Sequence, residues 1–271
     1  MGLDDDAREY HRQDPPGKIE ISTTKPTNTQ RDLSLAYSPG VAAPCSDIHE
    51  DRNLAYDYTA KGNLVGVISN GSAVLGLGDI GAQASKPVME GKGVLFKRFA
   101  DIDVFDIELD FDEPADVITA TKAMEPTFGG INLEDIKAPD CFEIEERLRE
   151  EMSIPVFHDD QHGTAIIIGA GLVNAADIVG KDLETLSVTI SGAGASAIAT
   201  AEFLVSLGVD RDNITMCDSS GIITTDRVDA GELNAYKARF AQDRAEGGLA
   251  DAIESTDVFI GLSVGGIVSP E

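Results

Sequence analysis

The chain has 271 residues, of which 42% are hydrophobic, and this is enough apolar material for one large or two modest domains. Its 48 acidic side chains outnumber 21 lysines and arginines, so the formal net charge of −27 argues against nucleic acid and anionic membranes as partners. Because the acids are spread along a chain that keeps its apolar segments, the composition indicates a halophilic protein whose surface is solvated at high salt.

The beginning of the chain is polar. Residues 1–28 contain a Pro-Pro-Gly sequence and predict an arm on the surface instead of a core element. The first residues are charged and lack the apolar run of a signal peptide, and no later segment offers about 18 uninterrupted apolar residues. Cys45, Cys141 and Cys217 are odd in number and widely spaced, which favours reduced thiols. We therefore expect a cytoplasmic protein.

Apolar runs of strand length recur along the chain, and segments with helical spacing separate them. The runs are residues 64–68, 73–77, 104–109, 154–157, 186–190, 213–217 and 258–262. Continuous apolar strands with helices between them are what a parallel sheet covered on both faces requires. The sequence therefore predicts an α/β fold.

A change in composition marks a domain boundary. The sequence His162-Gly163-Thr164 opens a long helix rich in Ala, Ile and Gly, and we place the boundary there, giving domains 1–161 and 162–271. The second domain contains a strand, a glycine-rich turn, a helix over 195–207 and further strands. That order predicts a Rossmann-like, doubly wound nucleotide-binding sheet.

Two acidic segments are candidate metal ligands. Asp159 and Asp160 follow a short apolar strand, and Glu134 and Asp135 form a second pair flanked by apolar residues. Carboxylates suit Mg²⁺ or Mn²⁺, whereas the neighbouring histidines lack the glutamate of a zinc-binding HExxH motif. On its own, the Glu134 pair is more typical of a helix cap or a surface acid.

Lysines and a tyrosine are further candidates. Lys86, Lys92 and Lys97 lie on a predicted helix after the glycine-rich segment 74–81, where lysines usually form a solvated face. A lysine that is partly desolvated beside a cation could instead act as a general base. Residues 31–40 predict a short helix that ends in a turn, where Tyr37 either packs against the protein or faces a cleft.

The segment Ser191–Ala197 contains a GxGxxA variant of the dinucleotide-binding fingerprint. It follows a predicted strand and opens a helix, so its backbone N–H groups can face a pyrophosphate, although a plain tight turn is the alternative. The candidate contacts are Gly192, Ala193, Gly194, Ala195 and Ser196. Asp218 closes the next strand, where a carboxylate often binds the ribose hydroxyls of the cofactor.

These segments, in this order, resemble malic enzymes of the bacterial and archaeal branch. The resemblance extends from about residue 15 onward and rests on residues 37–42, 75–81, 86–92, 134–135 and 157–165. It implies a malic-type α/β domain followed by a Rossmann-like domain. It also implies a nucleotide domain that continues beyond residues 260–263, so we expect this domain to be incomplete at its C-terminal end.

The resemblance implies roles for individual residues. Glu134, Asp135 and Asp160 would bind Mg²⁺ or Mn²⁺, with Asp159 behind them. Lys92 would take the proton from the 2-hydroxyl of malate, with Lys86 as the competing candidate, and Tyr37 would protonate the enol. The residues of the glycine-rich turn would contact the cofactor phosphates.

The implied reaction is the oxidative decarboxylation of (S)-malate to pyruvate and carbon dioxide with reduction of NAD(P)⁺. Two alternatives stay open, namely a metal-dependent oxaloacetate decarboxylase without redox turnover and a non-catalytic NAD(P)-binding or assembly module. The choice between NAD and NADP also stays open, because Ser220 stands where NADP-preferring relatives often have a basic residue, and Arg227 could supply that charge. The resemblance further implies a homodimer or higher homo-oligomer.

Overall fold

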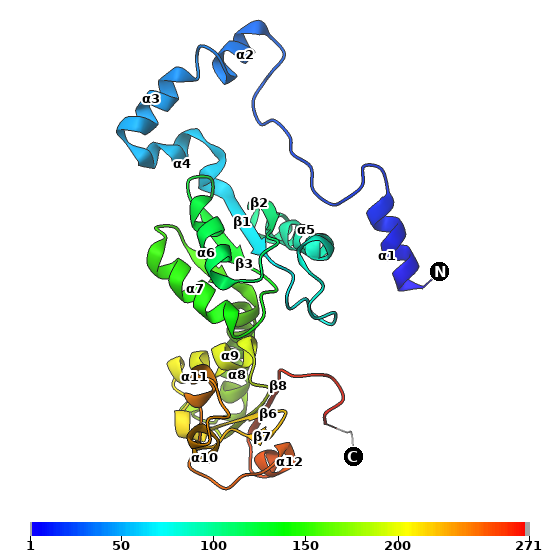
Figure 1. The fold of residues 1–271 in the computed structure, drawn as a ribbon, viewed down its shortest axis with the longest axis vertical. Coiled ribbons are helices and arrows are strands. Elements are labelled where there is room, and N and C mark those ends of the chain that lie inside the picture. The colour runs from blue at the N-terminus through cyan, green and yellow to red at the C-terminus, as the bar shows by residue number, and fades with distance from the viewer. Residues whose placement is uncertain (1, 269–271) are drawn as a thin grey trace. The chain divides into compact units, whose positions relative to one another are not determined.

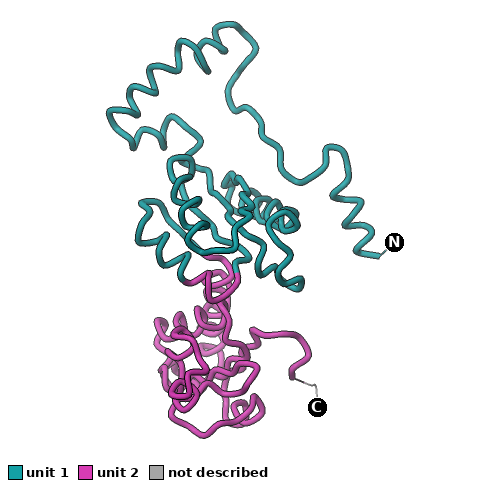
Figure 2. The backbone as a smooth tube through the Cα atoms, in the orientation of Figure 1, with its two compact units in different colours: residues 1–136, 143–157 teal, residues 137–142, 158–271 magenta. Residues whose placement is uncertain are grey.

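The computed structural model describes residues 2–268, which form two compact α/β units (Figures 1 and 2). The first unit comprises Met1–Ile136 with Glu143–Phe157, and the second comprises Lys137–Phe142 with His158–Glu271. The main division lies between residues 157 and 158, close to the predicted boundary between 161 and 162, and the short segment 137–142 also belongs to the second unit. The predicted α/β fold class is confirmed.

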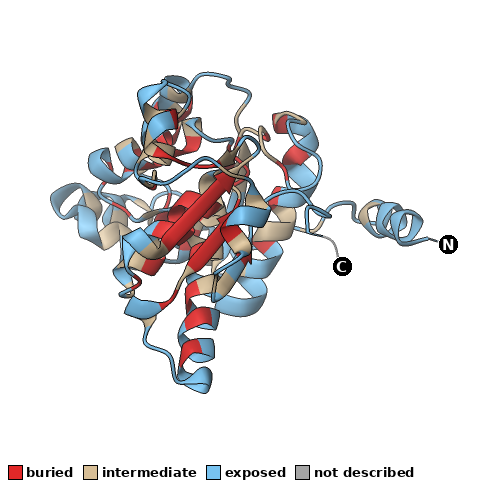
Figure 3. Ribbon diagram, turned by 90° about the horizontal axis from the view of Figure 1, so that it is seen from below, coloured by how far each residue is buried: buried red, intermediate tan, exposed pale blue. Residues whose placement is uncertain are grey.

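A four-stranded sheet forms the centre of the first unit, in the order β2-β1-β3-β4. Strand β1 runs parallel to β2 and β3, with Val65 opposite Val104 and Gly130. Val67, Met89 and Val104 pack together in its core, where burying such a side chain contributes about 1.5–3 kcal/mol. Figure 3 shows that buried residues concentrate on the strands. The strands and their helices are β1 (Leu64–Ser69), α5 (Ala82–Ala100), β2 (Asp103–Glu108), α6 (Pro114–Ala123), β3 (Gly130–Leu133), α7 (Asp140–Glu151) and β4 (Val156–His158).

Four helices precede the first strand, and none of them contains a buried residue over the part of the chain described. They are α1 (Leu3–Arg12), α2 (Gln30–Ala36), α3 (Ala42–Glu50) and α4 (Ala55–Tyr58). A capping box between Thr29 and Asp32 begins α2. Figure 1 shows α2 and α3 beyond the amino end of β1. Large apolar side chains of this segment, including Leu33 and Leu35, are exposed.

The predicted buried strand at residues 73–77 is wrong. The chain instead makes a tight loop in which the backbone N–H of Val74 donates to the carbonyl of Gly78 over 2.9 Å. Gly76 and Gly78 have φ angles of 78° and 75°, which reverse the chain and which a β-strand does not contain. Val74 is buried at 3% exposure, but Leu75 is 94% exposed, so the apolar composition of this loop reflects burial only in part.

The centre of the second unit is a four-stranded sheet in the order β7-β6-β5-β8. Strand β5 runs parallel to β6 and β8, while the two-residue strand β7 is antiparallel to β6. The strands are β5 (Val188–Ser191), β6 (Ile214–Asp218), β7 (Gly221–Ile222) and β8 (Val258–Gly261). The helices are α8 (Thr164–Val179), α9 (Ala195–Ser206), α10 (Thr225–Asp229), α11 (Ala235–Ala238) and α12 (Leu249–Ile253). Short 3₁₀ or π turns also occur in both units: η1 and η2 lie at 52–54 and 60–63 in the first, and η3 to η5 lie at 159–163, 183–185 and 211–213 in the second.

Helices α8 and α9 pack closely against each other. A side chain at Gly169 on α8 would meet the ring of Phe203 on α9 at 2.5 Å, so the absence of a Cβ permits the contact. The stretch Asp159–Val179 is long and apolar enough to cross a membrane by length and composition. Its packing against α9 accounts for part of this apolar character, while Ile167 and Ile178 stay exposed.

All three cysteines are free thiols, as the sequence predicts. Cys45 on α3 is exposed, whereas Cys141 and Cys217 are buried. Burial raises the pKa of the Cys217 thiol to about 11, because an apolar environment disfavours the thiolate. Only the Cys45 side chain is therefore placed to react from solution.

Candidate functional site

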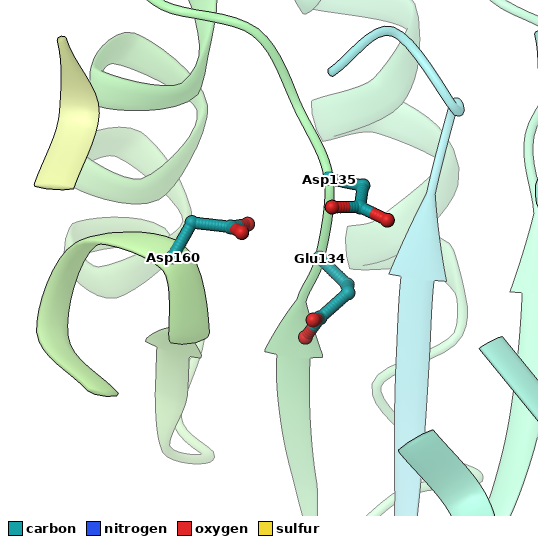
Figure 4. A group of neighbouring side chains, drawn as sticks. All are labelled: Glu134, Asp135 and Asp160. Atoms are coloured by element: carbon teal, nitrogen blue, oxygen red, sulfur yellow. The ribbon is translucent and has the colours of Figure 1, made fainter. Parts of the chain in front are cut away.

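Three carboxylates converge after neighbouring strands of the first sheet. Glu134 and Asp135 directly follow β3, and Asp160 is the second residue after β4. One ligand oxygen from each of the three lies within 4.8 Å of the others (Figure 4). The structure thus brings together all three predicted metal ligands, although Asp160 lies 25 positions after Asp135 in the sequence.

Backbone and side-chain contacts hold two of these acids in place. The amide of Asn132 donates to Glu134 Oε2 over 2.9 Å, and the Glu134 backbone N–H donates to the carbonyl of Ile68 on β1 over 3.0 Å. Asp135 has a φ angle of 55°, a left-handed conformation that turns the chain immediately after β3. Its carbonyl accepts from the N–H of Ala73 over 3.0 Å, which ties the loop at 73–78 to this turn.

A divalent cation fits this donor set. Glu134 and Asp135 are 6% and 4% exposed, and neighbouring carboxylates at such burial repel one another strongly. Lys92 Nζ lies 2.9 Å from Glu134 Oε1, and His158 Nδ1 lies 3.7 Å from Asp160 Oδ2. Oxygen ligands of this kind are those that Mg²⁺ and Mn²⁺ prefer. These residues could therefore hold a hard divalent ion.

The two competing lysines on α5 have different partners. Lys92 reaches Glu134 and its side chain is 17% exposed. Lys86 instead bonds to Asp106 Oδ2 on β2 over 2.6 Å and lies 3.4 Å from Glu108 Oε2. Partial burial alone would lower the pKa of Lys86, but the hydrogen bonds and negative charges of Asp106 and Glu108 together outweigh burial and raise it. Of the two, Lys92 is the lysine at the carboxylate cluster.

Tyr37 lies away from this cluster within the first unit. It is the C-terminal cap residue of α2 and is 78% exposed. Helix α2 lies beyond the amino-terminal end of β1 (Figure 1). Glu134 lies at the other end of the strands, since it follows Leu133, which pairs with Ile68 near the carboxyl-terminal end of β1. The structure thus brings Lys92 and the three acids together but leaves Tyr37 of the same chain at the other edge.

The glycine-rich turn joins β5 to α9. Gly192 has a φ of 125°, and a Cβ there would come within 2.4 Å of the Leu262 carbonyl oxygen, so only glycine fits. Gly194 is the N-cap of the twelve-residue helix α9. The N-terminus of such a helix presents backbone N–H groups and a partial positive charge, which suit a phosphate.

A pocket of about 720 Å³ opens within the second unit. Its walls come from the N-terminal part of α8 and the end of β8, including Asp159, Thr164 and residues 259–262. This volume is in the range of small-molecule and cofactor sites. Leu262 links the pocket to the glycine-rich turn, because its carbonyl oxygen lies against Gly192.

Asp218 ends β6 and is paired with two cations. Arg227 Nη1 and Nη2 donate to its two oxygens over 3.0 and 3.1 Å, and Lys237 Nζ donates to Oδ2 over 2.9 Å. Burial alone would raise the pKa of this carboxyl, but the hydrogen bonds from Arg227 and Lys237 prevail and lower it to about 2. Sequence reasoning missed Lys237, because no motif connects it to an aspartate 19 positions earlier.

Two family models together match most of the chain. "Malic enzyme, N-terminal domain" matches residues 16–116 and 111–149, and "Malic enzyme, NAD binding domain" matches residues 161–267. The first model matches the part of the chain that contains the first sheet, and the second model matches the part that contains the second sheet.

Relatives and solved structures agree with these matches. The chain is 56% identical to an NADP-dependent malic enzyme and 55% identical to an NAD-dependent malic enzyme, both of Rhizobium meliloti, over 98% and 99% of its length. It spans 35% of each of these relatives. The crystal structure of an NAD-dependent malic enzyme from Thermotoga maritima superposes with a TM-score of 0.91 at 46% identity, covering 97% of this chain and 70% of that one.

Proposed function

Because this chain belongs to the malic enzyme family, we propose that it carries the substrate-binding, metal-binding and dinucleotide-binding residues of a cytoplasmic enzyme that oxidises and decarboxylates (S)-malate to pyruvate. The observation that supports this most strongly is the group of three carboxylate oxygens within 4.8 Å of one another, with Lys92 2.9 Å from one of those acids. NAD(P)⁺ is the electron acceptor.

Glu134, Asp135 and Asp160 would hold Mg²⁺ or Mn²⁺. The ion would supply positive charge beside the 2-hydroxyl and the adjacent carboxylate of malate, and later beside the new carbonyl oxygen. Asn132 orients Glu134 through its amide, so the ligand oxygen keeps its direction when the site is loaded.

Lys92 is the general base of the oxidation step. As its neutral amine it would accept the proton of the 2-hydroxyl, and bound NAD(P)⁺ would supply the two-electron oxidant that takes the C2 hydrogen as hydride, so that malate becomes oxaloacetate. The C3–C4 bond then breaks, carbon dioxide leaves, and a phenol proton delivered to C3 completes pyruvate. The N-terminus of α9 and the turn at Gly192–Gly194 would bind the pyrophosphate of the cofactor.

Tyr37 supplies that proton, and it does so from a second copy of the chain. Two features support a homodimer of this kind. Helix α2 lies at the edge of the sheet opposite Glu134, and the segment before β1 exposes apolar side chains such as Leu33 and Leu35, which a second copy would cover. Each site would then combine Lys92 of one chain with Tyr37 of its partner.

Mixing two inactive variants tests this arrangement. Tyr37→Phe and Lys92→Ala are each expected to lose malate oxidation, but a refolded equal mixture should recover up to about a quarter of the normal activity, because half of the dimers are mixed and each has one intact site. Mixtures that stay as inactive as their parents would contradict a site shared between chains.

The reaction itself is tested by following NAD(P)H absorbance with malate and Mn²⁺ in molar KCl, and oxaloacetate loss in a parallel assay without nucleotide. Cofactor reduction that requires both malate and Mn²⁺ supports the malic enzyme reaction. Oxaloacetate loss alone would identify a decarboxylase without redox turnover, and nucleotide binding without either reaction would identify a non-catalytic module.

A further inference from the structure

A second pocket lies in the first unit, away from the carboxylate cluster. Its volume is about 740 Å³, which is in the range of small-molecule sites. Leu64 and Asp103, the first residues of β1 and β2, line this pocket, whereas Glu134 follows the last residue of β3. Because these strands are parallel, the pocket lies at the opposite end of the sheet from the candidate metal site.

Most of the pocket wall is apolar. In the described sheet, β2 has only β1 as a neighbour, so Phe105 lies on an edge strand, where it is 37% exposed. A ligand with an apolar body would remove this wall from water, and such burial is favourable. The apolar side chains of the wall are those of Ile19, Ile21, Leu64, Val94, Val104 and Phe105.

The segment 18–24 of the N-terminal arm forms one side of the pocket. Its beginning is fixed to α5, because the backbone N–H of Lys18 donates to Glu90 Oε2 over 2.9 Å. Ile19 then packs beside Gly93, where a Cβ would lie 3.0 Å from Ile19 Cδ1. The segment itself forms no helix or strand, so this side of the pocket can adjust to a ligand.

Arg98 gives the pocket a cation without a partner. Among residues 2–268, no ion pair or hydrogen bond to its guanidinium group is found. Lys97, in the same turn of α5, is in contrast already paired with Asp103 over 3.0 Å. The charged residues of the wall carry a net charge of +1 in a chain whose net charge is −27, and they are Lys18, Glu20, Lys97, Arg98 and Asp103.

We propose that this pocket binds an aliphatic carboxylate, with its hydrocarbon chain against the apolar wall and its carboxylate on Arg98. A planar guanidinium group matches a carboxylate, because two of its N–H groups can donate to the two oxygens. One unpaired cation suits one carboxylate, whereas a second carboxylate on the ligand would meet apolar side chains or the acids Glu20 and Asp103. The inference depends neither on malate turnover nor on dinucleotide binding.

Isothermal titration calorimetry of the whole chain at one fixed KCl concentration tests this, with octanoate as the probe. We expect one octanoate per chain, bound about 10-fold or more tightly than octylammonium, which has the same chain length and the opposite charge. The net charge of −27 would favour octylammonium, so the expected order reports the local charge of the pocket. Acetate, which lacks the hydrocarbon chain, should not bind over the same concentration range.

Arg98→Gln should weaken octanoate binding about 10-fold, because the paired charge is lost. Arg149→Gln is the matched control and should leave octanoate binding unchanged. Arg149 lies in the last turn of α7 in the same unit, is exposed, and has no ion pair or hydrogen bond from its side chain within the described part of the chain. Equal losses in the two variants, equal affinity for octanoate and octylammonium, or no octanoate binding at all would overturn the inference.

Val94→Trp tests the apolar wall. Val94 is 38% exposed, so the larger side chain should fill the pocket and abolish octanoate binding while circular dichroism stays unchanged. Undiminished octanoate binding in this variant would place the ligand elsewhere and overturn the inference. Sedimentation of the unmodified chain and of Val94→Trp distinguishes another occupant. If the substitution separates a dimer into monomers, the pocket is a contact between two copies of the chain and not a carboxylate site.

Discussion

The charged side chains at the carboxyl-terminal ends of the strands differ between the two sheets, and we call these ends the first and second edge. At the first, Glu134, Asp135 and Asp160 bring three carboxylates together, with Lys92 beside Glu134, and a divalent cation could bind between their oxygens. At the second, Asp218 is held between Arg227 and Lys237, beside a helix N-terminus that favours anions. The comparison teaches that the topology of an α/β sheet determines where polar side chains gather. The charges of those side chains then determine whether the site favours a cation or an anion.

The largest effect is expected at the first edge. Lys92→Ala should lower malate oxidation at least about 10³-fold, because the base of the oxidation step is lost. Lys86→Ala, on the same helix, is the control and should keep activity within about threefold, because Lys86 bonds to Asp106 and Glu108 on β2. Circular dichroism would verify that both variants are folded. Equal losses in the two variants would remove Lys92 from its assigned role.

A second prediction addresses the cation directly. Saturating Mn²⁺ should raise the melting temperature of the protein, since a ligand at 100 times its dissociation constant adds about 2.7 kcal/mol to the free energy of unfolding. Asp135→Asn should abolish that increase, and Asp140→Asn, a nearby acid outside the cluster, should keep it. An undiminished Mn²⁺ response in Asp135→Asn would mean that the ion binds elsewhere.

The third prediction concerns the second edge. The pKa of Asp218 is lowered to about 2, so its ion pairs stabilise the fold above the unfolded pKa near 4 and lose that contribution as pH falls toward 2. Asp218→Asn should therefore lower the free energy of unfolding by about 1–2 kcal/mol at pH 7, with the difference from the normal protein shrinking below pH 4. Urea unfolding of both proteins at pH 7 and again below pH 4 measures this difference in the free energy of unfolding. A pH-independent difference would contradict this account.

The smallest effect per residue is the salt dependence of the melting temperature, which arises from the many acidic side chains that belong to neither of the two sites. With a net charge of −27, the folded chain repels itself in dilute buffer, and molar KCl should raise its melting temperature by about 5 °C or more. The Asp135→Asn and Asp218→Asn variants should show the same salt response, because it arises from the whole surface. A melting temperature that does not rise would argue against a halophilic adaptation.

Local sequence signals predicted the second sheet well. The strand at 186–190, the glycine-rich turn and the helix from 195 match β5, Gly192–Gly194 and α9 within two residues, because each has its own local pattern. The resemblance to malic enzymes is also confirmed. In contrast, β3 was not recognised as a strand, since its four residues are few and include a polar Asn132.

What the sequence could not predict are contacts made by tertiary structure. The segment 73–77 has the apolar composition of a strand, but Gly76 and Gly78, with positive φ, turn it into a loop that exposes Leu75 and Leu77. The pairing of Lys237 with Asp218 depends on where α11 packs, which no local pattern encodes. The roles assigned to Tyr37 and to the metal ligands stay predictions.

The contrast among the three thiols gives the protein a single attachment point. Cys141 and Cys217 are enclosed, and the Cys217 thiol, with a pKa of about 11, is almost wholly protonated at neutral pH. A maleimide should therefore modify Cys45 alone, on the helix that follows Tyr37. In the proposed homodimer, a spin or fluorescent probe on Cys45 of each chain would report the distance between the two N-terminal segments, and no engineered cysteine would be needed.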